Sequence, residues 1–409
     1  MERAFDVVVW GATGFTGRLV ARYLAEHHGG ARVALAGRDL TKLDGLRASL
    51  PGDGPRFPIL CGDASDRGAL DAVVRQARVV ATTVGPYARY GDELVAACVD
   101  AGTHCCDLTG EVPWMRKMID LHHDRAAERG VRVVHTCGFD SLPSDLGVLR
   151  VQALCHARFG RFARRVRLFA GEARGGFSGG TIASMLELAQ ELGRDRAVAR
   201  LLRDPYALNP APRPTGPDQG DPTAVEYVSD LGQWAGVFLM ASVNTRVVRR
   251  AHALRGSPYG HDFRYSEQMS FGRGPLGLAR ALGVTAALGG FFGAVRVEAL
   301  RNLLQRHVLP PPGQGPSEEA IARGFFVVRL LADEIPGHPG ERVQVTVRGS
   351  GDPGYGATAR MLSEAALCLA LDPLDTPFGD LPPSIAMGEP LVERLARADV
   401  RFEDEPPAA

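Results

Sequence analysis

Short apolar runs alternate with amphipathic stretches over the first third of the chain. Residues 6–10 and 78–84 are nearly continuous apolar runs, which is the pattern of parallel strands covered on both faces. Between such runs lie stretches with the 3.6-residue helical period, for example at 92–101. This order predicts an α/β fold, a Rossmann-type doubly wound parallel sheet over residues 1–150.

The pattern changes character beyond that point. Residues 165–174 alternate with period two, as a half-exposed antiparallel strand does. Two more strand-like runs and an alanine-rich helix follow, at 325–332, 342–348 and 358–371. This order predicts a second α+β domain at 151–375, for substrate binding or dimerisation. We expect the remaining segment, 376–409, to pack back on the first domain.

An apolar segment at 281–295, between Arg280 and Arg296, has neither pattern. As a helix it would cover roughly 22 Å, less than the ~30 Å of a hydrocarbon core, so we do not expect it to span a bilayer. Three interpretations remain: a buried helix of the second domain, the lining of a channel for a long apolar substrate, or a helix on a membrane surface. We favour the buried helix.

The first apolar run leads directly into a glycine turn, Gly11-Ala-Thr-Gly14-Phe-Thr-Gly17, followed by an amphipathic helix. Gly11 and Gly14 allow a tight turn and close approach of a pyrophosphate, and Gly17 lets helix and strand pack closely. The free amides at the start of the helix would face an anion. Strand, turn and helix together predict a dinucleotide site.

The end of the second predicted strand, 32–37, distinguishes NAD from NADP. An acidic residue there would bind the ribose 2′-hydroxyl, whereas an arginine would accommodate a 2′-phosphate. Arg38 comes first, and the Asp39 that follows is suited to capping the next helix. NADP is therefore the expected cofactor. Asp63, after the third apolar run, either touches the adenine or closes a turn, and the sequence leaves both open.

Two loops follow later strands at the sheet edge where open α/β sheets bind ligands. In the first, Gly85 and Pro86 fix the backbone, and Tyr87 offers a hydroxyl near the expected nicotinamide or else closes the loop as a surface aromatic.

The second loop, 137–145, carries small, polar and proline residues. Ser144 is a plausible cap for a helix that begins at Asp145. That assignment leaves Asp140 and Ser141 available for chemistry.

Composition narrows the function further. Acidic and basic residues are equal in number at 47 each, so no electrostatic footprint for nucleic acid exists. Lys42 and Lys117 are the only lysines, which restricts lysine-based catalysis to these two. Seven cysteines without metal-ligand spacing predict reduced thiols, no metal site and a cytoplasmic protein. The chain starts almost at the first strand, so no signal peptide is expected.

A bound NADP implies hydride transfer. No tyrosine is followed four residues later by lysine, the pair that short-chain dehydrogenases use, so carbonyl reduction by that route is not expected. Reduction of an activated alkene needs a hydride at the β-carbon, a donor for the enolate oxygen and a proton for the α-carbon. Tyr87, Asp140 and Ser141 are the candidates for these roles.

Two alternatives compete with this interpretation. Cys137 could act as a thiolate nucleophile, as in semialdehyde dehydrogenases, with His135 as its base two residues earlier on the same face of a strand. The chain could also be a non-catalytic NADP-binding protein that associates with lipid through its apolar segment.

Four motifs in order resemble the saccharopine dehydrogenase-like oxidoreductases, and within them the trans-acting enoyl reductase branch: 11–17, Ala36-Gly-Arg38, 85–91 and 137–145. The resemblance covers nearly the whole chain. It implies cofactor contacts at Gly11, Thr13, Gly14, Phe15, Thr16, Gly17, Arg38 and the Gly85 loop. It also implies reduction of a double bond in a polyketide-derived lipid.

We therefore expect an NADP-dependent enoyl reductase acting on a long apolar or polyketide-derived substrate. Peripheral contact with the inner membrane surface and a homodimer are both compatible with the sequence.

Overall fold

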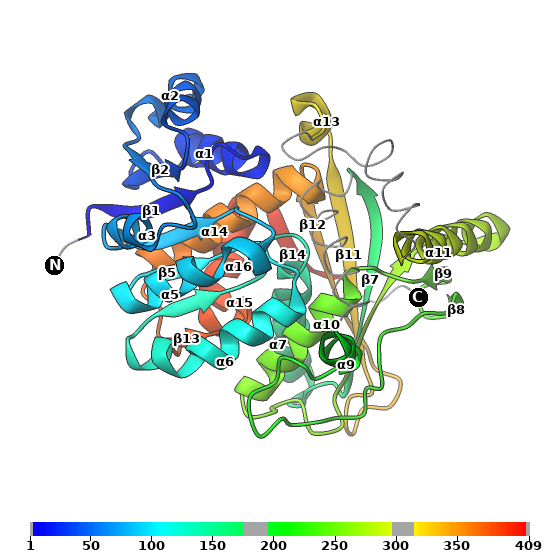
Figure 1. The fold of residues 1–409 in the computed structure, drawn as a ribbon. Helices are drawn as coiled ribbons and strands as arrows, with labels where there is room; N and C mark the ends of the chain where they lie inside the picture. The colour runs from blue at the N-terminus through cyan, green and yellow to red at the C-terminus, as the bar shows by residue number, and fades with distance from the viewer. Residues whose placement is uncertain (1–2, 176–194, 297–314, 406–409) are drawn as a thin grey trace.

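Two seven-stranded sheets form the framework of the protein (Figure 1). The computed structural model describes residues 3–175, 195–296 and 315–405. The first sheet has the order β13-β6-β5-β4-β1-β2-β3, and its neighbouring strands pair in parallel. Its strands are β1 (Phe5–Trp10), β2 (Val33–Gly37), β3 (Ile59–Cys61), β4 (Ala77–Thr82), β5 (His104–Cys106), β6 (Arg132–Val134) and β13 (Gly379–Asp380).

The strand order reverses between β1 and β4, so their carboxyl ends open the crevice in which doubly wound sheets bind ligands. The predicted Rossmann-type sheet is thereby confirmed. Helices between the strands are α1 (Phe15–His27), α2 (Leu40–Ser49), α3 (Arg67–Val74), the single turn α4 (Tyr87–Tyr90), α5 (Asp92–Ala101) and α6 (Val112–Glu128).

Side chains of β1 alternate between two hydrophobic cores. Val7 and Val9 belong to the core that includes α1, whereas Val8 and Trp10 face the core that includes α3 and α5. A strand with helices on both sides must be apolar at every position, because its side chains point alternately to each face. This explains the continuous apolar run.

The helix α14 (Thr358–Leu371) covers the first sheet together with α1. It packs against α1, β1, β4 and β5, although the sequence pattern assigned it to the second domain. The C-terminal residues then divide between the sheets: β13 extends the first sheet beside β6, and β14 (Val400–Glu405) pairs with β12 in the second. The sequence could not predict that the chain returns to the first sheet, because the pattern of a buried helix does not specify the sheet on which the helix packs.

The second sheet is mixed, with the order β14-β12-β11-β7-β10-β9-β8. Its remaining strands are β7 (Arg165–Arg174), β8 (Glu226–Val228), β9 (Gln233–Gly236), β10 (Arg264–Ser270), β11 (Phe325–Asp333) and β12 (Val343–Ser350). β7 runs parallel to β10 and antiparallel to β11. The helix α7 (Leu142–Phe159) packs on β11 and β12, and α10 (Ala241–Leu254) packs on β10 and α7.

Two helices differ from their predictions. α7 begins at Leu142, so Ser144 lies inside its first turn and Ser141 occupies the N-cap position. The apolar segment is part of a longer helix, α11 (Gly274–Arg296), and most of it is exposed, so the favoured interpretation as a buried helix was wrong. At 23 residues α11 is roughly 34 Å long, which makes it long enough and apolar enough to cross a membrane by length and composition alone.

Glu364 on α14 links α1, the helix that follows the glycine turn, to the C-terminal part of the chain. Its carboxylate accepts a hydrogen bond from the Tyr23 hydroxyl at 2.8 Å and lies 2.7 Å from Nε2 of His28. Arg394 of α16 (Glu389–Arg397) donates to it at 3.2 Å. Burial alone would raise the pKa of Glu364, but the bonds from His28, Tyr23 and Arg394 outweigh it and hold the pKa below its ordinary value.

We expect Glu364→Gln to lower the free energy of unfolding by about 3 kcal/mol, because it removes one partner of a buried charge network. Urea denaturation at pH 7 measures the loss. A carboxylate with a lowered pKa stabilises the fold above its unfolded pKa, so the difference should shrink as the pH falls below about 4.5. Glu26→Gln, which affects an exposed pair with Arg22, is the control and should cost less than about 0.5 kcal/mol. Equal stability of both variants would contradict the assignment.

Candidate active site

Two glycines of the turn have no room for a side chain. Gly11 has φ +84°, and a Cβ there would lie 2.5 Å from Cγ2 of Val84. A Cβ on Gly17 would lie 2.2 Å from the carbonyl oxygen of Gly11, which is backbone and cannot move aside. Gly14 is exposed and is the N-cap residue of α1. The turn therefore presents bare backbone at the carboxyl end of β1.

The amino end of α1 is open to an anion. No side chain caps it and its first turn holds no acidic residue, so its N–H groups and its positive dipole end remain available. Thr13 and Thr16 flank this end and are half-buried. The ring of Phe15 packs edge-on against Tyr355 at 4.6 Å between centroids, so the turn also touches the segment that leads into α14. These features suit a pyrophosphate.

Arg38 follows β2 with an exposed side chain, and no ion pair to it is found in the described part of the chain. The neighbouring Asp39 caps α2, accepting from the backbone N–H of Lys42 at 3.0 Å, so its carboxylate is already engaged. The guanidinium is therefore the group free to meet a ribose 2′-phosphate. Asp63 closes a turn by accepting from the amide and the hydroxyl of Ser65, which matches the second of its two predicted roles.

The loop after β4 is held by a buried carboxylate that sequence reasoning did not single out. Oε1 of Glu111 accepts from the Tyr87 amide at 3.0 Å, and Oε2 accepts from the Ala88 amide at 2.7 Å. Gly85 and Pro86 precede these amides at the carboxyl edge of the sheet. Glu111 thus fixes the path of the loop beside the expected nicotinamide.

Tyr87 is buried, and its hydroxyl is occupied. It donates to the carbonyl of Thr82 at 3.3 Å and accepts from the amide of Leu108 at 3.1 Å, which ties the ends of β4 and β5 together. Burial raises the pKa of Tyr87 well above its ordinary value. This placement favours a role in holding the loops over a role in proton transfer.

Asp140 and Ser141 both lie in the loop after β6, but their surroundings differ. The Ser141 hydroxyl is fully buried and donates to Asn244 at 2.8 Å. Asp140 is half-buried, and within the described residues its carboxylate has no hydrogen-bond partner. Loss of solvent raises the pKa of Asp140 to about 6. Burial also raises the pKa of Asp145 to about 6, but Asp145 accepts hydrogen bonds from the amide and hydroxyl of Ser384, so Asp140 is the carboxyl group that can change protonation near neutral pH without such partners.

Ser141 is connected to a buried hydrogen-bond network that the sequence did not reveal. Asn244 of α10 donates to Glu267 of β10 at 2.9 Å, and Tyr265 donates to the same carboxylate at 2.6 Å. Burial raises the pKa of Glu267 to about 7. No local sequence motif could have predicted this network, because Ser141 and Asn244 are 103 positions apart.

Within the part of the chain that the structure describes, no base forms a hydrogen bond with Cys137. His135 binds Asp107 through Nδ1 at 2.6 Å and Asp380 through Nε2 at 3.0 Å, so both ring nitrogens are used. Burial would lower the pKa of His135, but the two carboxylates outweigh it and raise the pKa well above its ordinary value. The Cys137 thiol is fully buried and contacts the carbonyl oxygens of Val134 and His135. This geometry gives no support to the thiolate mechanism.

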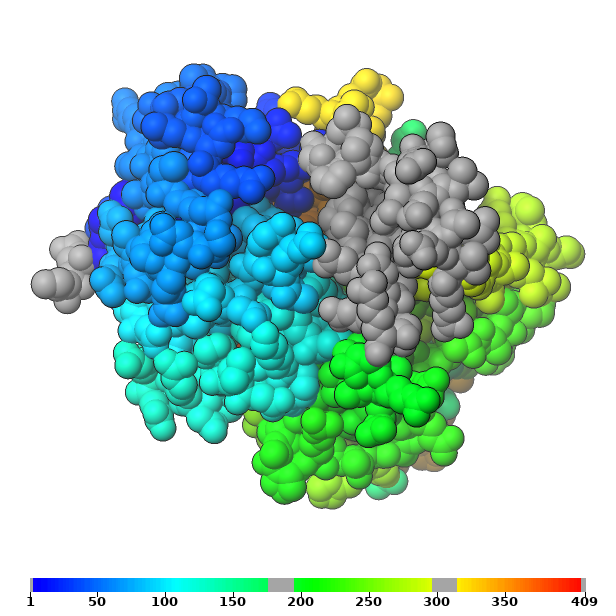
Figure 2. Space-filling view, in the orientation of Figure 1, coloured from blue at the N-terminus to red at the C-terminus, as the bar shows by residue number. Residues whose placement is uncertain are grey.

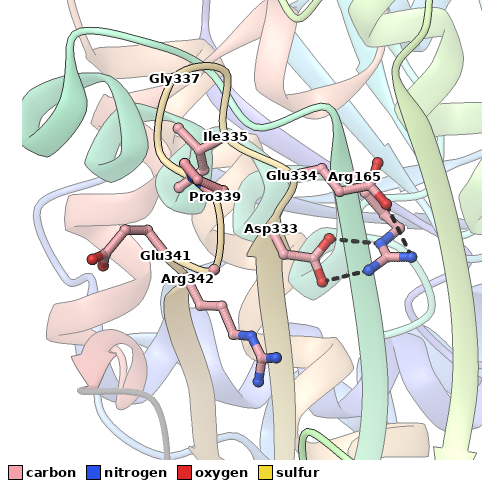
Figure 3. A pocket seen from close by; sticks show the side chains of 9 residues that line it. Arg165, Asp333, Glu334, Ile335, Gly337, Pro339, Glu341 and Arg342 are labelled. Carbon is pink, nitrogen blue, oxygen red and sulfur yellow. Dashed lines mark hydrogen bonds and ion pairs between the residues drawn. The ribbon is translucent and has the colours of Figure 1, made fainter.

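A cavity of about 420 Å³ lies elsewhere, at the turn between β11 and β12 (Figure 3). Four of its charged lining residues form ion pairs, among them Arg165 and Asp333 at 2.6 Å. The other end of β12 leads to the segment that packs on Phe15, and a strand of eight residues spans roughly 23 Å. The cavity is therefore separate from the glycine turn. No cluster of potential metal ligands is found among the described residues.

We expect Arg38→Ala to weaken NADPH binding at least tenfold and NADH binding less than about twofold. Only NADPH carries the 2′-phosphate, and a hydrogen bond to a charged group contributes about 1.5–3 kcal/mol. Calorimetric titration with both nucleotides measures the ratio. Arg47→Ala removes a partly exposed arginine on α2 and should leave both affinities unchanged. Equal losses for the two nucleotides in Arg38→Ala would overturn the role of Arg38.

Comparison with known proteins agrees with this geometry. Residues 7–134 match the family described as saccharopine dehydrogenase NADP binding domain. A protein of Mycobacterium tuberculosis whose name assigns it provisionally as a trans-acting enoyl reductase is 44% identical, and the match covers 98% of this chain and 97% of that one. The trans-acting enoyl reductase of Mycobacterium leprae is 39% identical with the same coverage.

One solved structure, the apo saccharopine dehydrogenase (L-Glu forming) of Saccharomyces cerevisiae, shares the fold over 98% of this chain and 99% of its own, with a TM-score of 0.55 and 12% identity. The cofactor of the chain is NADP, and the chain is an NAD(P)-dependent oxidoreductase. By its full-length similarity, it belongs to the family of the trans-acting enoyl reductases.

Proposed function

We propose that this protein reduces the activated double bond of an enoyl group on a long apolar or polyketide-derived chain. The names of its full-length relatives support the reaction class. The observation that carries the proposal is Asp140, a half-buried carboxyl with a pKa of about 6 in the loop after β6. A reductase of this kind needs such a proton donor, and Asp140 has no competing hydrogen bond in the described residues.

Residues at the carboxyl edge of the first sheet position the reactants. The amino end of α1 would hold the pyrophosphate of NADPH, and Arg38 would hold its adenosine half near the end of β2. The nicotinamide half would then reach across β4 and β5 toward β6, which is three strands or roughly 14 Å from β1. Asp140 stands at the end of that path.

NADPH, when bound, would supply a hydride to the β-carbon of the enoyl group. The electron pair of the double bond moves onto the carbonyl oxygen, and the Asp140 carboxyl then gives its proton to the α-carbon. One hydride and one proton are consumed, and the saturated chain and NADP⁺ are formed. Tyr87 and Glu111 keep the loop after β4 in place, and Ser141 holds the start of α7 against α10.

We expect Asp140→Asn to lower the single-turnover rate of enoyl reduction about 100-fold, because general acids contribute 10²–10⁴-fold. The acid form of Asp140 donates, so the wild-type rate should fall about tenfold per unit as the pH rises above 6, and the variant should lose this slope. Stopped-flow NADPH oxidation with a long-chain 2-enoyl thioester measures both.

NADPH affinity should be unchanged in Asp140→Asn, and Asp124→Asn, at an exposed position on α6, should leave the rate and the slope unaltered. An unchanged pH profile in Asp140→Asn would remove Asp140 from the mechanism. Tight NADPH binding with no oxidation by any enoyl thioester would remove the reaction itself.

A further inference from the structure

The helix α11 is apolar and largely exposed. Leu276, Leu282 and Val284 expose 61%, 53% and 37% of their surface. Only 11% of its most apolar 18-residue window is buried. One side of the helix lies along β9, where Gly277 approaches Trp234. The other side faces outward at the edge of the molecule (Figures 1 and 2).

The glycines of α11 lower the stability of this helix in water. A Cβ on Gly283, Gly289, Gly290 or Gly293 would meet nothing within 4 Å, so no packing contact requires glycine at these positions. Glycine is the weakest helix former after proline, and here it brings no compensating contact. In an apolar layer the same sequence stays helical, because an unpaired peptide group has no water to bind.

The base of α11 carries the residue types that favour a lipid headgroup layer. Tyr227 on β8 is 53% exposed and stacks edge-on with Trp234 of β9 at 5.4 Å. Arg273 precedes the helix beside them, near Gly232. Tyrosine, tryptophan and arginine are the side chains that anchor proteins at a membrane–water interface.

Charge complementarity points to an anionic surface. Between Gly274 and Arg296 the charged residues are Arg280 and Arg296, and no acidic residue occurs. Arg273, just before the helix, is also basic, so the sequence 273–296 carries positive charge alone. Anionic lipids attract such arginines, whereas a typical protein partner would offer an apolar groove without a requirement for negative charge.

We propose that α11 docks the protein on an anionic lipid bilayer, lying in the interface with its outward side in the acyl region and with Tyr227, Trp234 and Arg273 at the headgroups. Both flanks of α11 return to the same folded body: Phe271 bonds to Trp234, and Gly315 lies against Phe15. The intervening sequence 297–314 contains Glu298, Arg301, Arg306 and three prolines, which is not a sequence that crosses a bilayer.

This surface is independent of the proposed reaction, because vesicle binding requires no turnover. Its use to the protein would be access to long apolar chains that reside in the membrane. Loss of vesicle binding and loss of enoyl reduction can therefore be told apart.

Tryptophan fluorescence gives a specific measurement. The chain has three tryptophans, and Trp10 and Trp114 are 2% and 3% exposed, so a blue shift on adding vesicles reports Trp234. We expect the shift, and quenching by brominated acyl chains, with vesicles of phosphatidylglycerol and phosphatidylcholine in equal parts. Binding should weaken as salt is raised, and pure phosphatidylcholine should bind several-fold more weakly.

Leu276→Glu/Leu282→Glu should reduce vesicle binding at least tenfold, because two carboxylates would enter the acyl region. Leu121→Glu/Leu371→Glu places the same charges on leucines that are 53% and 44% exposed on other helices and should bind like wild type. Arg273→Ala/Arg280→Ala should weaken binding about tenfold to anionic vesicles only. Unchanged NADPH affinity in every variant shows that the fold is intact.

Two outcomes would overturn the proposal. The first is a wild-type protein that neither shifts its fluorescence nor floats with anionic vesicles. The second is a stable dimer in light scattering that Leu276→Glu/Leu282→Glu dissociates while vesicles have no effect, since that result would assign α11 to a second copy of the chain.

Discussion

The close approach of α1 to β1 is the constraint on which the cofactor site depends. A single methyl group on Gly17 would lie 2.2 Å from the Gly11 carbonyl oxygen, so helix and strand can meet at this distance only through glycine. The contact aims the uncapped end of α1 at the crevice between β1 and β4. The anion site is therefore a consequence of backbone packing more than of any side chain.

The opposite side of α1 is held by a part of the chain that lies far away in sequence. Glu364 joins Tyr23, His28 and Arg394, and α14 packs across β1, β4 and β5. The same segment begins with Tyr355 against Phe15. The nucleotide-binding turn and the second sheet are thus parts of one packed unit, so a displacement of α14 would also displace the turn.

The carboxyl edge of the first sheet separates groups that hold structure from a group available for chemistry. Tyr87, Ser141 and His135 all have their hydrogen-bonding capacity occupied by neighbouring elements. Asp140 does not, within the described residues, and its raised pKa follows from desolvation without a compensating partner. A loop rich in polar residues can therefore contain few reactive ones, because most of them close the fold around the site.

Local patterns determined the strands β1 to β6 of the first sheet, the glycine turn, the capping of α2 by Asp39, and the helix at 92–101, since each depends on neighbours within a few residues. Only the tertiary structure placed α14 on the first sheet, brought Asn244 to Ser141 and engaged both nitrogens of His135, because these contacts join residues far apart in the chain. The apolar helix shows the same division. The sequence showed that residues 281–295 are apolar. Whether this helix lies in the core or on the surface depended on which surfaces the two sheets left uncovered.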